Sequence, residues 1–152
     1  MKRSVERRYR EPVAVVETTA VLPASPERVE AYVSDPAKVV ELSPDIESFE
    51  LSGPLAVGTK VREVRRVLGR RMELRWTVTE YEPNRRMVFD WTGKRMRVTG
   101  VVTLEPVDGG TRVSTHNDIQ STGAFRLLEG LIAWGVRREE RTMFDRLRAR
   151  LS

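Results

Sequence analysis

The sequence predicts an α+β domain in which a seven-stranded, curved antiparallel sheet wraps a long C-terminal helix around an apolar cavity. Three observations carry this prediction. Runs of alternating apolar and polar residues recur between Gly, Pro and Asn turn signals through the middle of the chain. Two short helical segments follow the first strand-like run. The last segment, 124–151, is the longest helical stretch and carries an apolar stripe.

The start of the chain predicts one strand and two short helices. Residues 13–22 alternate and are rich in Val and Thr, which favours a strand. Ser25 can cap the helix that follows, with Pro26 at its first position. That helix is expected to end before Pro36, and a second short helix is expected over 37–42.

Six further strands are expected in the middle of the chain, because turn signals divide it into short strand-like runs. Neighbouring runs joined by short turns should pair antiparallel. The predicted strands are 46–52, 59–68, 71–81, 86–92, 95–105 and 111–120. Their alternation makes one face apolar and aromatic and the other polar, which is typical of a sheet covered on one side only.

The final helix supplies an apolar stripe that can pack on the inner face of this sheet. Its members, spaced by three, four or seven residues, are Phe125, Leu128, Ile132, Val136, Met143 and Leu147. We expect a ligand cavity between stripe and sheet. The residues predicted to line it and bind the ligand are Tyr32, Met72, Leu74, Trp76, Phe89, Trp91, Met96, Val98, Thr115, Asn117, Phe125, Leu128 and Ile132.

Length and cysteine content limit the possible architectures. With 152 residues and no cysteine, the chain fits one domain without disulfides or a thiolate metal site. Residues 1–11 are polar and charged and are interpreted as a flexible basic tail, with 12–152 forming the domain. Neither the apolar stretch of an export signal nor that of a membrane span is visible in the sequence. We therefore expect a cytoplasmic protein without stable membrane insertion.

The charge of the chain raises the question of an anionic partner. The net charge is +5, from 27 basic and 22 acidic residues whose signs are interspersed. This mixture favours a solvated surface over a nucleic-acid footprint, and the sequence contains no nucleic-acid motif. We expect no nucleic acid partner. In an alternative interpretation, the basic tail and last helix engage a macromolecule or an anionic membrane in a salt-dependent manner.

Several short motifs carry a resemblance to a known superfamily. The segment Leu22-Pro-Ala-Ser-Pro-Glu-Arg-Val29, followed by Asp35-Pro36 and Pro44-Asp-Ile46, resembles the opening motif of the START-like, birch-pollen-allergen-like proteins. The segments Val78-Thr-Glu-Tyr-Glu-Pro83 and Gly109-Gly-Thr-Arg-Val113 resemble the bacterial polyketide cyclase/dehydrase and lipid-transport branch of that superfamily.

The resemblance, which extends over about residues 13–151, implies a helix-grip fold with a cavity between sheet and long helix. Members bind lipids, sterols, polyketides or quinones, and a minority catalyse cyclisation or dehydration. The chain departs from the pattern at Glu30 and Leu42, where relatives frequently carry aromatic residues. Both positions belong to the expected cavity mouth, so no ligand is carried over from a relative.

The single histidine is the obvious candidate for a general base, because imidazole titrates near neutral pH. The alternation of its strand places Val113 and Thr115 on the inner face and His116 outside, so we predict a surface histidine. The sequence shows no Ser/His/Asp arrangement, no glycine-rich phosphate loop and no clustered metal ligands. We expect neither a metal nor a cofactor.

The third strand-like run allows two registers. If Val61 faces inward, Glu63 and Arg65 do so too, and buried opposite charges are costly unless they are paired or bound to polar groups of a ligand. If instead Val64 faces inward, Glu63 is a surface residue. In the first register Glu63 and Arg65, together with Asn117, are the candidate catalytic or ligand-anchoring groups.

Two features of the last helix bear on partners. Glu139 interrupts the apolar stripe and is interpreted as an ordinary, partly exposed residue. Leu127, Leu131 and Trp134 lie on the face away from the stripe. They predict a homodimer interface or a membrane-touching patch, with cover by a loop as the alternative.

The inner sheet face is aromatic, and the sequence shows no recognisable arrangement of catalytic residues. Together these features favour a non-enzymatic carrier or sensor for a lipid, polyketide or quinone-like molecule. The enzymatic alternative is a polyketide cyclase or dehydratase. In it Glu63 acts as acid and base, and Arg65 or Asn117 polarises a carbonyl.

Overall fold

The computed structural model describes residues 14–67, 69–93 and 95–152, apart from the side chains of Val67, Phe125 and Arg126. The predicted tail 1–11 lies outside the described residues. Seven strands form one antiparallel sheet in the order β1-β7-β6-β5-β4-β3-β2. They are β1 (Ala14–Leu22), β2 (Ile46–Leu51), β3 (Lys60–Val67), β4 (Arg70–Glu82), β5 (Arg86–Thr92), β6 (Met96–Val107) and β7 (Gly110–Ser121).

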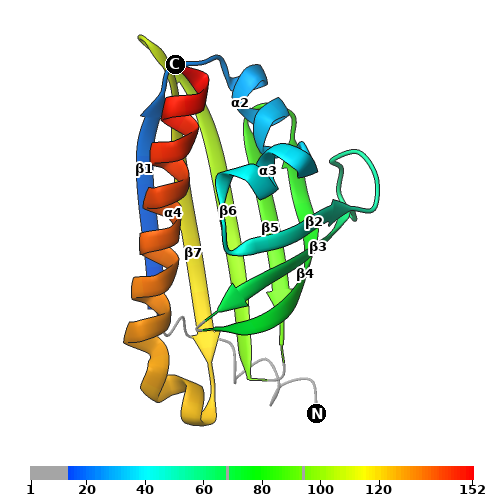
Figure 1. The fold of residues 1–152 in the computed structure, drawn as a ribbon, viewed down its shortest axis with the longest axis vertical. Helices are drawn as coiled ribbons and strands as arrows, with labels where there is room; N and C mark the ends of the chain where they lie inside the picture. The colour runs from blue at the N-terminus through cyan, green and yellow to red at the C-terminus, as the bar shows by residue number, and fades with distance from the viewer. Residues whose placement is uncertain (1–13, 68, 94) are drawn as a thin grey trace.

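The long helix α4 (Glu129–Leu151) packs on one side of the curved sheet, alongside β1 (Figure 1). The short helices α2 (Pro26–Val33) and α3 (Pro36–Leu42) close the end of the sheet at which α4 finishes. The predicted fold class is confirmed, and each of the six middle strands lies within two residues of its predicted bounds.

Local signals explain where the short helices begin. The Ser25 hydroxyl accepts a hydrogen bond from the backbone N–H of Arg28 at 3.2 Å, which caps α2. The Asp35 carboxylate does the same for the N–H of Ala37 at 3.1 Å, which caps α3. Each cap is followed by a proline at the first helical position, where a missing N–H costs nothing.

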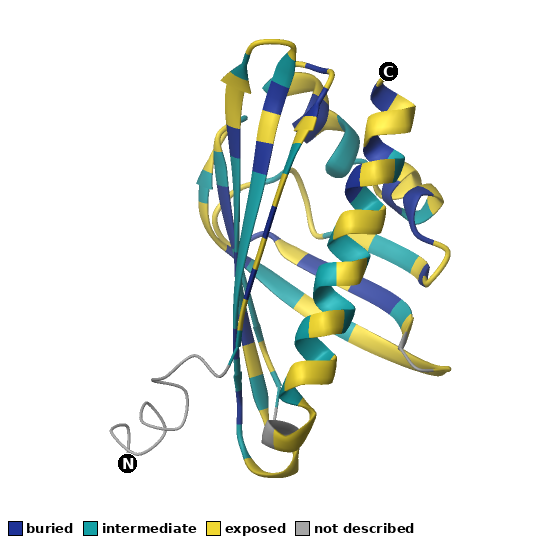
Figure 2. Ribbon diagram, turned by 90° about the vertical axis from the view of Figure 1, so that its left-hand side faces the viewer, coloured by how far each residue is buried: buried dark blue, intermediate teal, exposed yellow. Residues whose placement is uncertain are grey.

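The packed core lies at the end of the sheet that α2 and α3 cover. There Leu22, Val29 and Leu104 pack against Phe144 and Leu147 of α4. Figure 2 shows buried residues on the C-terminal part of α4, whereas its N-terminal half is intermediate or exposed. The two ends of α4 therefore meet different environments, one a closed core and the other partly open.

The start of the long helix differs from the prediction. A 3-10 helix, η1 (Gly123–Leu128), precedes α4, whereas one continuous helix was expected over 124–151. A 3-10 turn holds three residues rather than 3.6, so its side chains leave the stripe that α-helical spacing predicts. Leu128 is accordingly 49% exposed, and its predicted place on the buried stripe is wrong. Phe144, absent from the predicted stripe, is buried instead.

Candidate functional site

Two tryptophans lie on the inner face of the sheet. Trp76 on β4 and Trp91 on β5 have ring centroids 6.3 Å apart and planes tilted by 43°. Both rings are only partly buried and pack beside a small core cluster of Val16, Val98 and Ile119. The predicted lining residues that this cluster brings together are Trp76, Trp91, Met96, Val98 and Ile132.

The other predicted lining residues are spread more widely. Leu74 and Phe89 share the inner face through their pairing register. Met72 lies on the same face of β4 as Leu74 but is exposed. Tyr32 packs against the closed core at the α2 end, so it does not join the tryptophans. The side chain of Phe125 lies outside the described part of the structure.

Strand pairing decides the register of β3. Val61 lies opposite Trp76 and Glu63 lies opposite Leu74, so Glu63 and Arg65 point to the inner face. Their side chains are only 10% and 14% exposed, respectively. The inward register is therefore the one that forms.

Arg65 links β3 to the long helix. Its Nη1 lies 3.8 Å from Glu63 Oε1, and its Nη2 forms an ion pair with Glu139 of α4. Its buried Nε has no hydrogen-bond partner among the described residues. Glu139 is partly exposed, as predicted, with 34% of its side chain accessible, but it is also the helix partner of an inward arginine, which the sequence did not indicate.

The environment of Glu63 suits it to proton transfer. Burial raises the pKa of the Glu63 carboxyl, against the opposing effects of the Arg65 charge and a hydrogen bond with Trp76. A carboxyl with a raised pKa can donate and accept protons closer to neutral pH than a solvated one. Glu63 therefore meets one chemical requirement of the enzymatic alternative.

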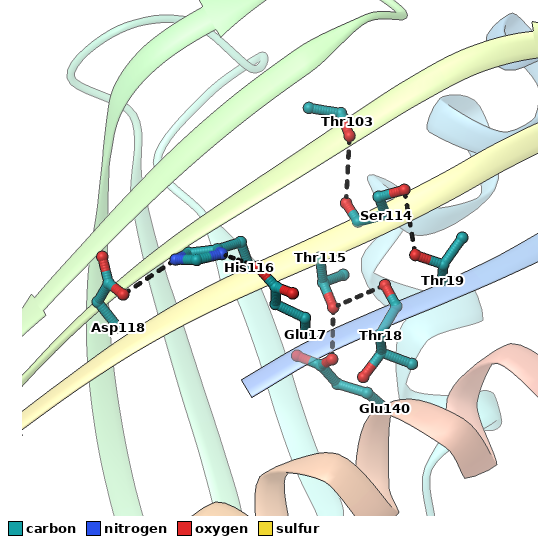
Figure 3. Close-up of polar contacts among 9 residues, drawn as sticks. All are labelled: Glu17, Thr18, Thr19, Thr103, Ser114, Thr115, His116, Asp118 and Glu140. Carbon is teal, nitrogen blue, oxygen red and sulfur yellow. Dashed lines mark hydrogen bonds and ion pairs between the residues drawn. The ribbon is translucent and has the colours of Figure 1, made fainter. Parts of the chain in front are cut away.

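A second polar group on α4 faces β7. The Glu140 carboxylate accepts a hydrogen bond from Thr115 Oγ1 at 2.5 Å (Figure 3). It also accepts one from Asn117 Nδ2. Gly100 on β6 leaves room for this arrangement, since a Cβ there would lie 2.9 Å from Asn117 Oδ1. Glu140 was not among the residues predicted from the sequence, although the signal was present: it follows Val136 by four residues, on the face that packs against the sheet.

His116 lies on the opposite face of β7, as predicted. Its Nδ1 lies 2.7 Å from Glu17 Oε1 and its Nε2 lies 3.0 Å from Asp118 Oδ1 (Figure 3). The hydrogen bond with Glu17, followed by that with Asp118, raises the pKa of His116. With 41% of its side chain exposed, His116 belongs to a surface ion-pair group rather than to the inner site.

Two surface hollows flank the inner site. One, of about 280 Å³, lies between β1 and α4 and is lined by Thr18, Phe144 and Arg141, among others. The other, of about 300 Å³, lies beside α2 and is lined by Glu30 and Tyr81, among others. The buried Glu30 carboxylate accepts hydrogen bonds from the Tyr81 hydroxyl and from the Asn84 N–H, each at 3.0 Å. This departure from the family pattern therefore ties α2 to the β4–β5 turn.

The described residues bear on metal binding and on membrane spanning. There, no group of three or more His, Asp or Glu side chains is placed to hold a metal ion. No helix in the same part of the chain has an apolar stretch long enough to cross a membrane.

Comparison with known proteins places this site in a family context. Residues 13–152 match the family model described as polyketide cyclase / dehydrase and lipid transport. The chain belongs to this family. An uncharacterized family relative in Mycobacterium tuberculosis is 27% identical over 128 residues, which cover 82% of this chain and 90% of the relative.

Solved structures confirm the fold of this family member. The crystal structure of Ara h 8.0201 matches with a TM-score of 0.73 at 15% identity, covering 91% of this chain and 97% of the other. The di-domain ARO/CYC protein BexL matches with a TM-score of 0.80 at 16% identity, covering 96% of this chain and 53% of the other. A Thermus thermophilus protein matches with a TM-score of 0.65 at 24% identity, covering 91% of this chain and all of the other. The START-like, birch-pollen-allergen-like resemblance is thus confirmed at the level of fold.

Proposed function

We propose that this family member binds a small hydrophobic molecule between the inner sheet face and α4, as a carrier or sensor. The observation that carries the proposal is the half-buried pair Trp76 and Trp91. Aromatic rings that face inward yet stay partly exposed leave apolar surface for a ligand to cover. The few polar groups around them, such as Asn117 and Glu140, match the composition of a small-molecule site.

Native mass spectrometry of gently purified protein tests this proposal. We expect a stoichiometric hydrophobic adduct, which denaturing extraction would release for identification. A Trp91→Ala variant should lose the adduct, whereas Trp134→Ala, which removes an exposed tryptophan on α4, should keep it. Adduct-free protein that also fails to take up added lipids, polyketides or quinones would contradict the proposal.

An enzymatic function is the second candidate, and the position of Glu63 favours it. Its carboxyl is buried, its pKa is raised, and it lies beside Arg65. In a cyclase or dehydratase, Glu63 would transfer the proton, while Arg65 or Asn117 would polarise a substrate carbonyl. The related di-domain protein BexL is described as an ARO/CYC of a biosynthetic pathway, which supports the same reaction class.

Turnover of a polyketide-like substrate distinguishes the two functions. We expect Glu63→Gln to abolish turnover if Glu63 is the proton carrier, since an amide cannot exchange a proton in this role. Glu105→Gln is the matched control, because Glu105 is exposed on β6 and pairs with Arg112. Unchanged turnover in Glu63→Gln would reject the assignment and leave the carrier function standing.

A further inference from the structure

Three carboxylates lie between the inner sheet face and α4. Ion pairs and hydrogen bonds bring Glu63, Glu139 and Glu140 into this region together with Arg65. The chain as a whole carries a net charge of +5. Among these four side chains the carboxylates outnumber the guanidinium, so a ligand beside them meets carboxylates, whereas Arg141 and Arg148 line the outer hollow that Thr18 also borders.

Arg65 offers little to an anionic ligand. Its two terminal nitrogens already face Glu63 and Glu139, so two carboxylates share one guanidinium. Its buried Nε has no hydrogen-bond partner within the described residues. An anionic group would have to displace Glu139 or add a third negative charge beside Arg65.

Glu140 has only neutral partners, Thr115 and Asn117, among the residues that the structure describes. Beside it lies Thr18, which is 9% exposed and whose hydroxyl has no hydrogen-bond partner in the same part of the chain. Figure 3 shows Thr18, Thr115 and Glu140 gathered where β1 and β7 face α4. A buried hydroxyl without a hydrogen-bond partner destabilises the folded state, and a polar group of a ligand could supply the missing partner.

We propose that the ligand is an apolar molecule whose polar end donates hydrogen bonds, as a hydroxyl or a protonated amine, and that Glu140 and Thr18 bind this end. This inference rests on the proposed function and adds the polarity of the ligand. A hydroxyl or ammonium group donates to the Glu140 carboxylate, and a hydroxyl can also accept from Thr18. A carboxylate ligand could accept from Thr18, but it has no proton to donate to Glu140 and is repelled by the Glu140 charge.

Calorimetric titration with three matched compounds tests the inference. The compounds are 2-naphthalenemethanol, 2-naphthylmethylamine and 2-naphthoate, which share one ring system and differ in the polar end. We expect the alcohol and the amine to bind at least about tenfold more tightly than the carboxylate, a difference of about 1.4 kcal/mol. Glu140→Gln should reduce the preference for the amine over the carboxylate. Glu105→Gln also removes one negative charge, but from an exposed side chain on β6, so it should leave this preference unchanged.

The outcomes separate this inference from the function on which it rests. Binding of the carboxylate as tightly as the alcohol and amine would overturn the inference and leave hydrophobic ligand binding intact. A preference that Glu140→Gln does not alter would overturn the role of Glu140. Failure of all three compounds to bind would overturn the inference alone if the protein carries a hydrophobic adduct or takes up lipids, polyketides or quinones, and would overturn the proposed function with it if the protein does neither.

Discussion

Replacing Arg65 by methionine should destabilise the fold in a pH-dependent way. The variant keeps much of the side-chain volume but leaves Glu63 and Glu139 without their shared cation. At 3.8 Å and an effective dielectric constant of about 20, the attraction between Arg65 and Glu63 is about 4 kcal/mol. Removing the burial cost of the arginine offsets part of this, so we expect a loss of about 2–3 kcal/mol at pH 8.

The pH dependence follows from the pKa of Glu63. Burial raises that pKa, and Arg65 lowers it, so the variant should have a still higher pKa at Glu63. The folded state then holds the proton more tightly than the unfolded state. Protonation of Glu63 therefore stabilises the folded state. This contribution is complete below the unfolded pKa of about 4.3 and is lost as pH rises through the folded pKa. The deficit of the variant should therefore be smaller at pH 5 than at pH 8.

Urea unfolding monitored by tryptophan fluorescence at both pH values measures these differences. Arg66→Met is the matched control, because Arg66 is the next residue of β3, is 66% exposed and pairs with Glu47 on the surface. Its loss should be within about 1 kcal/mol at either pH. Equal losses in the two variants, or a deficit for Arg65→Met that does not change with pH, would refute the inward charge arrangement.

Three further predictions concern other parts of the molecule. His116 has a raised pKa, chiefly through Glu17, so its contribution to stability is present below pH 6.5 and fades as pH rises through the folded pKa; His116→Gln should flatten the melting temperature between pH 6 and 9, and an unchanged profile would contradict this. Thr111→Val should lose about 1–2 kcal/mol in urea unfolding, because the fully buried hydroxyl donates to the Ala24 carbonyl at 2.6 Å; a neutral effect would show that this hydrogen bond contributes little. We also propose a homodimer through the exposed side chains around Trp134. Trp134→Arg should then halve the mass measured by sedimentation, and a monomeric wild-type protein would contradict the dimer.

The alternation of apolar and polar residues along the strands was sufficient to predict most of the sheet. In β4 apolar residues occur at every second position, and in β7 Val113 and Ile119 share one face, so Trp76 and Val113 could be placed on the inner face and His116 on the outer face. Alternation failed in β3 because Val61 and Val64 fit opposite registers and are both buried, each with 3% exposure. Only pairing with β4, a contact with the neighbouring strand, chooses between them.

The polar part of the candidate site was harder to predict. Glu63 and Arg65 were identified as a pair whose position depended on the register, but their link to Glu139 joins residues more than 70 positions apart. Glu140 was missed because hydrophobic periodicity marks apolar positions and passes over a carboxylate whose hydrogen-bond partners lie on β7. Such partners are set by tertiary packing, which one sequence does not encode locally.

The pairing of β1 with β7 has a consequence for how the chain folds during its synthesis. Thr19 and Ser114 are neighbours in the sheet yet lie 95 residues apart in sequence. β1 therefore pairs only once β7, the last of the described strands, has been synthesised, and α4, which packs beside β1, comes later still. Such distant contacts slow folding and leave a strand edge open to other chains meanwhile. Nascent chains that end before β7 should accordingly depend on chaperones for their solubility.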